Sequence, residues 1–157
     1  MILLCYDGSS DAKAAIDRAG ELLSGQPATV LTVWEPFIDL MARSGGSFGL
    51  PPVDSVEIDA ATEKAARERA DEGVERARGV GFDAQPRTRS HDTTIAETIL
   101  AEADSVGAVA IVLGTRGLTG LKSLLLGSVS HALLQHADRT VIVVPSPEVA
   151  AERAAHR

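Results

Sequence analysis

Short apolar runs alternate with longer amphipathic stretches along the chain. Runs of about four to eight residues rich in Val, Ile and Leu are typical of buried strands, and the pattern predicts such strands at 1–6, 28–34, 84–90, 108–115 and 140–145. Between them, apolar side chains recur at helical spacing, which predicts helices over 9–23, 59–79, 93–104 and 128–138. This alternation indicates an α/β fold: a doubly wound, five-stranded, mostly parallel sheet with helices on both faces. We take the strand order to be 3-2-1-4-5.

Two of the predicted helices begin with capping sequences. Ser9 and Ser10 precede the first helix, and Asp11 places an acidic side chain in its first turn, as helix starts favour. Thr94 and Glu97 have the spacing of a capping box, in which each residue satisfies a free N–H group of the other.

The pattern predicts three segments less clearly. The predicted strand at 84–90, AQPRTRS, is the least apolar of the five, and we expect it at the edge of the sheet. Residues 35–58 are rich in proline and glycine and longer than an ordinary connection, so we expect a mobile loop that is either a lid or a tolerated insertion. Residues 148–157 have no evident partner, and we expect a frayed tail after a single domain over 1–147.

The composition narrows the function classes. The chain has 157 residues, of which 45% are hydrophobic but only 3% aromatic, so aliphatic side chains build the core. The net charge of −7 argues against nucleic acid or an anionic membrane as a partner, because both select basic surfaces; a local basic pocket is compatible with it. Cys5 is the only cysteine, which excludes an internal disulfide and fits a reducing cytosol.

We expect a cytoplasmic location. No apolar run approaches the roughly 18 residues that a membrane span needs. The first residues, MILLCYDGSS, lack the basic start of a signal peptide.

Polar and glycine-rich residues gather at the ends of two predicted strands. Ligands of doubly wound sheets bind beyond the carboxyl ends of the strands, where the strand order reverses. In the predicted order this place lies between the first and fourth strands, so Asp7 and the stretch 114–128, GTRGLTGLKSLLLGS, would lie side by side.

The glycines of this stretch suggest a close approach of the backbone to a ligand. Gly114 and Gly117 have no Cβ, so the chain can take a positive φ and come near a bound group. Gly127 and Ser128 begin the next helix, whose free N–H groups and positive dipole end favour an anion.

The side chains point to an oligophosphate. The hydroxyls of Ser128 and Ser130 can donate hydrogen bonds, and Arg116 and Lys122 supply positive charge. Asp7 is an acceptor suited to ribose hydroxyls or an adenine edge. Each feature has a plainer interpretation: a simple turn for the glycines, a cap for the serine and the aspartate, and a solvated loop for the two cations.

The spacing of Gly114, Gly117 and the pair at 127–128 resembles the nucleotide-binding signature of the universal stress protein family. The resemblance extends over nearly the whole chain, with YDGS after the first strand, the long segment after the second, and TVIVVP at 140–145. One departure is SHDTT at 90–94, where many members carry a glycine-centred turn, so the contacts of His91 and Asp92 on the ribose side are expected to differ.

The resemblance implies roles for individual residues. Asp7 would contact the nucleoside, Val33 and Leu113 would line the adenine pocket, and the glycines with Ser128 and Ser130 would hold ribose and phosphates. The candidate nucleotide-binding set is Cys5, Tyr6, Asp7, Val33, Leu113, Gly114, Thr115, Arg116, Gly117, Gly127, Ser128, Val129 and Ser130.

Other sites fit less well. A Walker A loop needs glycine directly before lysine, but Leu121 separates them, and the first strand is followed by a single glycine rather than a Rossmann fingerprint. A receiver domain would have an acidic pair before Asp7 and a lysine at the end of the fifth strand, whereas this chain has LLCY and VIVVPSP at these places. His131 and His136 are wrongly spaced for a shared metal ion. Cys5 is expected to pack as a small apolar residue beside the pocket. Trp34, which ends the second strand, could flank the adenine or cover the core, and we expect it to cover the core.

The sequence therefore predicts a protein that binds ATP, with Mg²⁺ carried by the phosphates, and acts in stress response as a sensor without a dedicated catalytic centre. Binding of cyclic AMP or AMP, and slow ATP hydrolysis, stay open as alternatives. The run Thr140 to Val144 carries no charge, and an unguarded edge strand favours pairing with a second chain. The resemblance also implies a homodimer, unless the tail covers this edge.

Overall fold

The computed structural model describes residues 1–43, 54–91, 93–117 and 126–155. Its centre is one sheet in which all neighbouring strands run parallel. The strands are β1 Ile2–Cys5, β2 Pro27–Trp34, β3 Asp83–Ser90, β4 Ala110–Gly114 and β5 Thr140–Val144. Their order is β3-β2-β1-β4-β5, which confirms the predicted topology and places β3 at one edge and β5 at the other.

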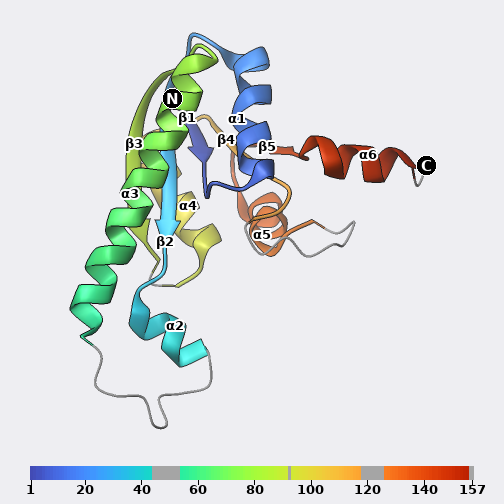
Figure 1. Cartoon of the computed structure of the whole chain (residues 1–157). Helices are drawn as coiled ribbons and strands as arrows, with labels where there is room; N and C mark the ends of the chain where they lie inside the picture. Colours follow the sequence, from blue (N-terminus) through green and yellow to red (C-terminus); the bar gives the residue numbers. More distant parts are fainter. Residues whose placement is uncertain (44–53, 92, 118–125, 156–157) are drawn as a thin grey trace.

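The described residues form helices α1 Ser10–Leu23, α2 Phe37–Arg43, α3 Ser55–Gly79, α4 Ile95–Ser105, α5 Ser128–His136 and α6 Pro147–Ala155. Both faces of the sheet are covered, as predicted (Figure 1). α1 and α3 pack on one face, and α4 and α5 pack on the other. No helix in the described ranges is long and apolar enough to cross a membrane.

The alternation of side chains along β1 divides the core in two. Ile2 and Leu4 pack with Ile16 of α1 on one face of the sheet. Leu3 points to the other face and packs with Ile99 of α4. Because successive strand residues point to opposite faces, a buried central strand must be apolar throughout, as β1 is.

Both predicted helix caps are present. The Ser9 hydroxyl oxygen accepts a hydrogen bond from the Ala12 N–H group at 3.2 Å, at the start of α1. At the start of α4, the Thr94 hydroxyl oxygen accepts from the Glu97 N–H group at 3.1 Å. These caps are decided by residues within one turn of each other, which is why the sequence alone locates them.

The prediction of a continuous loop over 35–58 is wrong at both of its ends. Helix α2 occupies Phe37–Arg43, and at seven residues it is too short to show a helical repeat in the sequence. α3 begins at Ser55 rather than at 59, because the Asp54 carboxylate accepts from the Val56 N–H group at 3.0 Å and caps the helix. The remaining part of the predicted loop, 44–53, lies outside the described residues.

The tail is not frayed over its described part. Residues Pro147–Ala155 form α6, whose start is supported by the Ser146 hydroxyl oxygen accepting from the Val149 N–H group at 3.4 Å. Val149 is buried, whereas most of α6 is exposed. In Figure 1, α6 runs away from the sheet toward the C-terminus.

The edge strand β3 is held by charge rather than by apolar packing. Of its side chains, only Ala84 is fully buried. On the face covered by α4, the Nε atoms of Arg87 and Arg89 lie 2.7 and 2.6 Å from the two carboxylate oxygens of Glu102. The Glu102 side chain is 2% exposed and both arginines are 42% exposed. One buried carboxylate therefore ties two residues of the edge strand to α4.

We predict that Glu102→Gln lowers the free energy of unfolding by about 1–2 kcal/mol. The loss stays moderate because the half-exposed arginines regain water when their partner becomes neutral. Glu75→Gln is the matched control, since its pair with Arg78 is exposed on α3 and such pairs contribute little. Urea denaturation measures both variants, and equal stability of the two would contradict the prediction.

Candidate functional site

A pocket of about 340 Å³ opens at the carboxyl ends of β1 and β4. Every residue of the candidate nucleotide-binding set lines it: Cys5, Tyr6, Asp7, Val33, Leu113, Gly114, Thr115, Arg116, Gly117, Gly127, Ser128, Val129 and Ser130. The structure thus brings together two chain segments more than a hundred residues apart, at the place where the strand order reverses. Lys122 and Asp92 lie outside the described residues.

One end of the pocket is apolar. Besides Val33 and Leu113, it is lined by Leu31 of β2 and by Ile95 and Ile99 of α4. Sequence reasoning missed these last three because they belong to ordinary core patterns. The spacing of Ile95 and Ile99 places both on one helix face, but which space that face lines depends on the packing of α4.

The other end of the pocket is formed by the start of α5. Gly127 is its N-cap residue and has no side chain with which to cap the helix. The Gly127 N–H group donates to the Thr115 carbonyl oxygen at 2.8 Å, which joins this helix start to the end of β4. The first-turn N–H groups of a helix have no partners within it, so this end offers donors and a positive dipole to an anion.

Gly114 is glycine for a different reason from the one predicted. Positive φ among the described residues occurs at Gly8, Gly25, Gly81 and Gly107, not at the glycines of the pocket. A Cβ atom on Gly114 would instead lie 2.6 Å from the Asp11 Cβ atom and 2.7 Å from the Asp11 carbonyl carbon. The end of β4 therefore passes directly against the first turn of α1, and there is no room for a side chain.

The other two glycines also make close approaches within the protein. A Cβ on Gly127 would lie 2.9 Å from the Thr115 carbonyl oxygen, and one on Gly117 would lie 2.8 Å from Asp7 Oδ2. The second distance shows that the ends of β1 and β4 face each other, as the predicted strand order requires.

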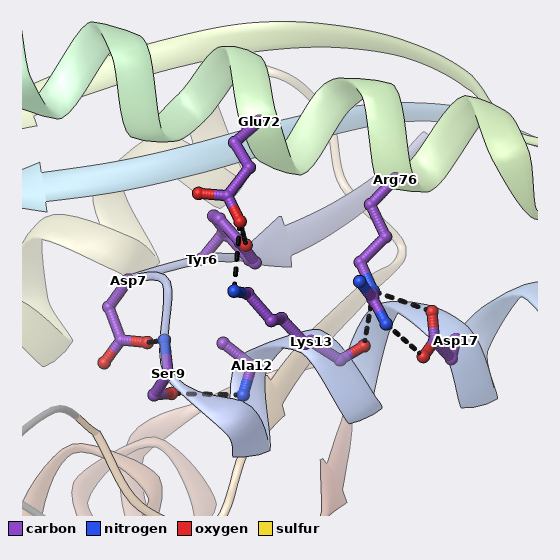
Figure 2. Close-up of polar contacts among 8 residues, drawn as sticks. All are labelled: Tyr6, Asp7, Ser9, Ala12, Lys13, Asp17, Glu72 and Arg76. Carbon is purple, nitrogen blue, oxygen red and sulfur yellow. Dashed lines mark hydrogen bonds and ion pairs between the residues drawn. The ribbon is translucent and has the colours of Figure 1, made fainter.

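Asp7 and Ser130 differ in how much of their hydrogen-bonding capacity is used inside the protein. Asp7 Oδ1 accepts from the Ser9 N–H group at 2.9 Å (Figure 2), while Oδ2 lies toward Gly117. The buried Ser130 hydroxyl donates to the Gly114 carbonyl oxygen at 2.9 Å. The predicted donor to a phosphate thus holds α5 to the end of β4 instead.

The side chain of Tyr6 points toward α3. Its ring leaves no room for a Cβ atom on Gly73, at 2.8 Å, and its hydroxyl donates to Glu72 at 2.8 Å (Figure 2). Lys13 of α1 lies 3.1 Å from the same carboxylate. Burial, followed by the hydrogen bond to Glu72, raises the pKa of Tyr6, so its phenol stays protonated and serves as a link between β1 and α3.

Cys5 behaves as the apolar residue that was predicted. It lines the pocket, and burial together with the negative charge of Asp7 raises the pKa of its thiol to about 12. The thiol is therefore protonated at neutral pH and is a poor nucleophile.

Arg116 is anchored within the protein. The Nε atom of its guanidinium lies 3.9 Å from Asp11 Oδ2, and its backbone N–H group donates to the same oxygen at 3.1 Å. The Thr115 hydroxyl also donates to this oxygen, at 2.5 Å. Sequence reasoning identified Asp11 only as a first-turn residue of α1, because nothing local indicates that its side chain reaches the end of another strand.

The segment SHDTT at 90–94, where the sequence departs from the family pattern, begins at the end of β3. His91 follows β3 and is buried, and its Nε2 atom lies 3.8 Å from Glu35 Oε1. Neither His91 nor Trp34 lines the pocket.

Within the described ranges, no three His, Cys, Asp or Glu side chains gather closely enough to hold a metal ion.

The fold and the position of the pocket define an α/β protein of the doubly wound class with a pocket at its switch point. The sequence model of the universal stress protein family matches residues 1–145, and the chain belongs to this family. It is 30% identical to universal stress protein YxiE of Bacillus subtilis over 145 residues, which cover 91% of this chain and 97% of that one. A universal stress protein of Thermus aquaticus is 32% identical over 149 residues, covering 91% and 96%.

Solved structures share the fold. Hypothetical protein MJ0577 is 22% identical, with a TM-score of 0.73 over 92% of this chain and 94% of that one. A universal stress protein in complex with cAMP is 22% identical, with a TM-score of 0.63 over 92% and 95%. The universal stress protein of Archaeoglobus fulgidus in complex with dAMP is 23% identical, with a TM-score of 0.58 over 91% and 95%. At these identities the likeness establishes the fold alone.

The contrast between two pocket glycines is testable. We predict that Gly114→Ala destabilises the protein by about 2 kcal/mol or more, because its Cβ would meet the backbone of α1. Gly117→Ala is the control and costs less than about 1 kcal/mol, since its Cβ meets only the end of the Asp7 side chain. Thermal unfolding compares the variants, and an unchanged melting temperature for Gly114→Ala would show that the contact is not tight.

Proposed function

We propose that this protein binds adenine nucleotides in the pocket between β1 and β4, with ATP as the preferred ligand and Mg²⁺ carried by its phosphates. The observation that carries the proposal is the order of chemistry along the pocket. An apolar end beside β2 suits a base, Asp7 after β1, the strand between β2 and β4, suits a ribose, and the N-terminus of α5, which follows β4, suits phosphate.

The related structures support the class of ligand. One fold neighbour was solved in complex with cAMP and another in complex with dAMP, and both ligands share the adenine base with ATP. The polar end of this pocket holds Arg116 as well as a helix N-terminus. That is more stabilisation of negative charge than one phosphate needs, which favours ATP over AMP and over the cyclic form.

The protein acts through binding rather than catalysis. Hydrolysis of a phosphate ester needs a positioned base and usually a held metal ion. Asp7 is the sole carboxylate among the described residues that line the pocket, and its Oδ1 atom is engaged by the Ser9 N–H group. We therefore assign the protein a role as a nucleotide-dependent regulator in stress response, and its single, unpaired cysteine fits a cytoplasmic location.

Calorimetric titration with adenosine, AMP, cAMP and ATP tests the ligand. We expect ATP to bind most tightly, and competition between ATP and cAMP settles the order of these two. Tighter binding of cAMP would contradict ATP as the preferred ligand. If none of the four compounds gives heat, the proposal of adenine-nucleotide binding is wrong.

Val33→Phe tests the location. A ring in the apolar end fills the space for the base, and we expect adenosine and ATP to bind at least about tenfold more weakly. Val109→Phe makes the same change at a residue that is 65% exposed and does not line the pocket, and it should bind normally. Unchanged binding by a folded Val33→Phe variant would place the ligand elsewhere.

We further propose that two copies pair through β5. This strand lies at the edge of the sheet, none of its residues is charged, and Val141 and Val143 are only partly buried. Antiparallel pairing about a two-fold axis would satisfy the free backbone groups of both copies. α6, which runs away from the sheet in Figure 1, leaves room for this arrangement.

Light scattering tests the dimer with two lysine variants. Val143→Lys places a charge in the paired edge, and we expect it to be monomeric at concentrations where the wild type is a dimer. Leu22→Lys adds the same charge at a side chain that is 62% exposed at the end of α1, and it should stay dimeric. A monomeric wild type at micromolar concentration excludes the dimer.

A further inference from the structure

We propose that Asp11 is a positioning and specificity-determining residue of the pocket: it holds Thr115 and Arg116 in place and, by partly neutralising the Arg116 guanidinium, limits the preference of the site for polyphosphates. This inference rests on the proposed binding of adenine nucleotides. Asp11 does not itself line the pocket, whereas Thr115 and Arg116 do, so it acts through them.

The carboxylate is buried and bound to both residues. Asp11 is 3% exposed. Its Oδ2 atom accepts from the Thr115 hydroxyl at 2.5 Å and from the Arg116 N–H group at 3.1 Å, and it lies 3.9 Å from the Arg116 Nε atom. Hydrogen bonds to an ionised acceptor are stronger than neutral ones, so these contacts hold the first two residues after β4 in one conformation.

Asp11 is not needed as the cap of α1. The Ser9 hydroxyl oxygen already accepts from the Ala12 N–H group. The Asp11 side chain instead reaches to the end of β4, and the absence of a side chain on Gly114 is what lets the two segments approach. The arrangement is therefore a contact between α1 and the phosphate end of the pocket, rather than local helix capping.

The charge of Asp11 has a consequence for the ligand. The Arg116 side chain is only 18% exposed, and at a distance of about 4 Å a carboxylate cancels much of the field that the guanidinium offers to a third group. A phosphate that approaches Arg116 competes with Asp11 for it. This competition reduces the gain in affinity over adenosine that the phosphates bring, and the reduction grows with the number of phosphates.

Asp11→Asn separates charge from shape. The amide oxygen can still accept from Thr115 and Arg116, while the negative charge is gone. We expect the ratio of the dissociation constants of adenosine and ATP to rise at least about threefold in this variant, with ATP binding becoming tighter and adenosine binding nearly unchanged. A side chain that only supports the fold would weaken both ligands together when altered and leave their ratio unchanged.

Matched variants complete the experiment. Asp17→Asn makes the same chemical change on the same helix, at a residue that pairs with Arg76 of α3 (Figure 2), and should change the ratio by less than about 1.5-fold. In an Arg116→Gln background, Asp11→Asn should raise the ratio much less than in the wild type. Where Asp11→Asn loses its cooperative thermal transition, Asp11→Ser removes the same charge with a smaller polar side chain.

The outcomes are distinct. An unchanged or lower ratio in folded Asp11→Asn, while the wild type binds adenosine and ATP, overturns the role of Asp11 and leaves the proposed function standing. No binding of any adenine compound to the wild type overturns the proposed function. Titration with inorganic pyrophosphate then still decides the role of Asp11, since the neutral variant must bind it more tightly than the wild type does.

Discussion

The close contact between the end of β4 and the first turn of α1 is the constraint on which the pocket depends. α1 follows β1 directly and must pass over the neighbouring strand β4, and Gly114 makes this possible because a Cβ atom there would lie 2.6 Å from that of Asp11. Thr115, the next residue after Gly114, is hydrogen-bonded to two further elements. The Thr115 N–H group donates to the Val144 carbonyl oxygen of β5, and the Thr115 carbonyl oxygen accepts from Gly127. One point of contact therefore aligns two strands and the start of α5.

The apolar end of the pocket is continuous with the core on the α4 side of the sheet. Leu31, Leu113 and Ile99 belong to that core and also line the pocket. A base bound there would extend an existing packed layer, and little apolar surface would have to rearrange to receive it. Because Ile95 and Ile99 of α4 line this end, the position of α4 affects its shape. The ion pairs of Glu102 with the edge strand thus bear on the pocket as well as on the fold.

Local signals account for what the sequence predicts well. The strands and both helix caps follow from apolar runs and capping residues, and the position of the pocket follows from the strand ends once the order 3-2-1-4-5 is assumed. The pocket roles of Val33 and Leu113 come instead from the resemblance to the universal stress protein family. What it misses depends on partners distant in the chain: the acceptor of the Ser130 hydroxyl, the direction of the Tyr6 ring and the reach of Asp11. Gly114 shows the difference most clearly, because glycine was expected there for a positive φ beside a ligand and is required instead by packing against Asp11. α6 is a local signal that was overlooked, since Ser146 before Pro147 is a common helix start.

The two faces of the sheet differ beside the pocket. On the other face, Gly73 lets the Tyr6 ring lie directly against α3, and the hydroxyl is held by Glu72 (Figure 2). The bidentate pair of Arg76 with Asp17, at 2.8 and 2.7 Å, joins α3 to α1 beside it. These contacts hold β1, α3 and α1 together on that side of the sheet. On the other side, the described residues that line the pocket include Ile95 and Ile99 of α4 and the start of α5, whose N-cap residue Gly127 has no side chain.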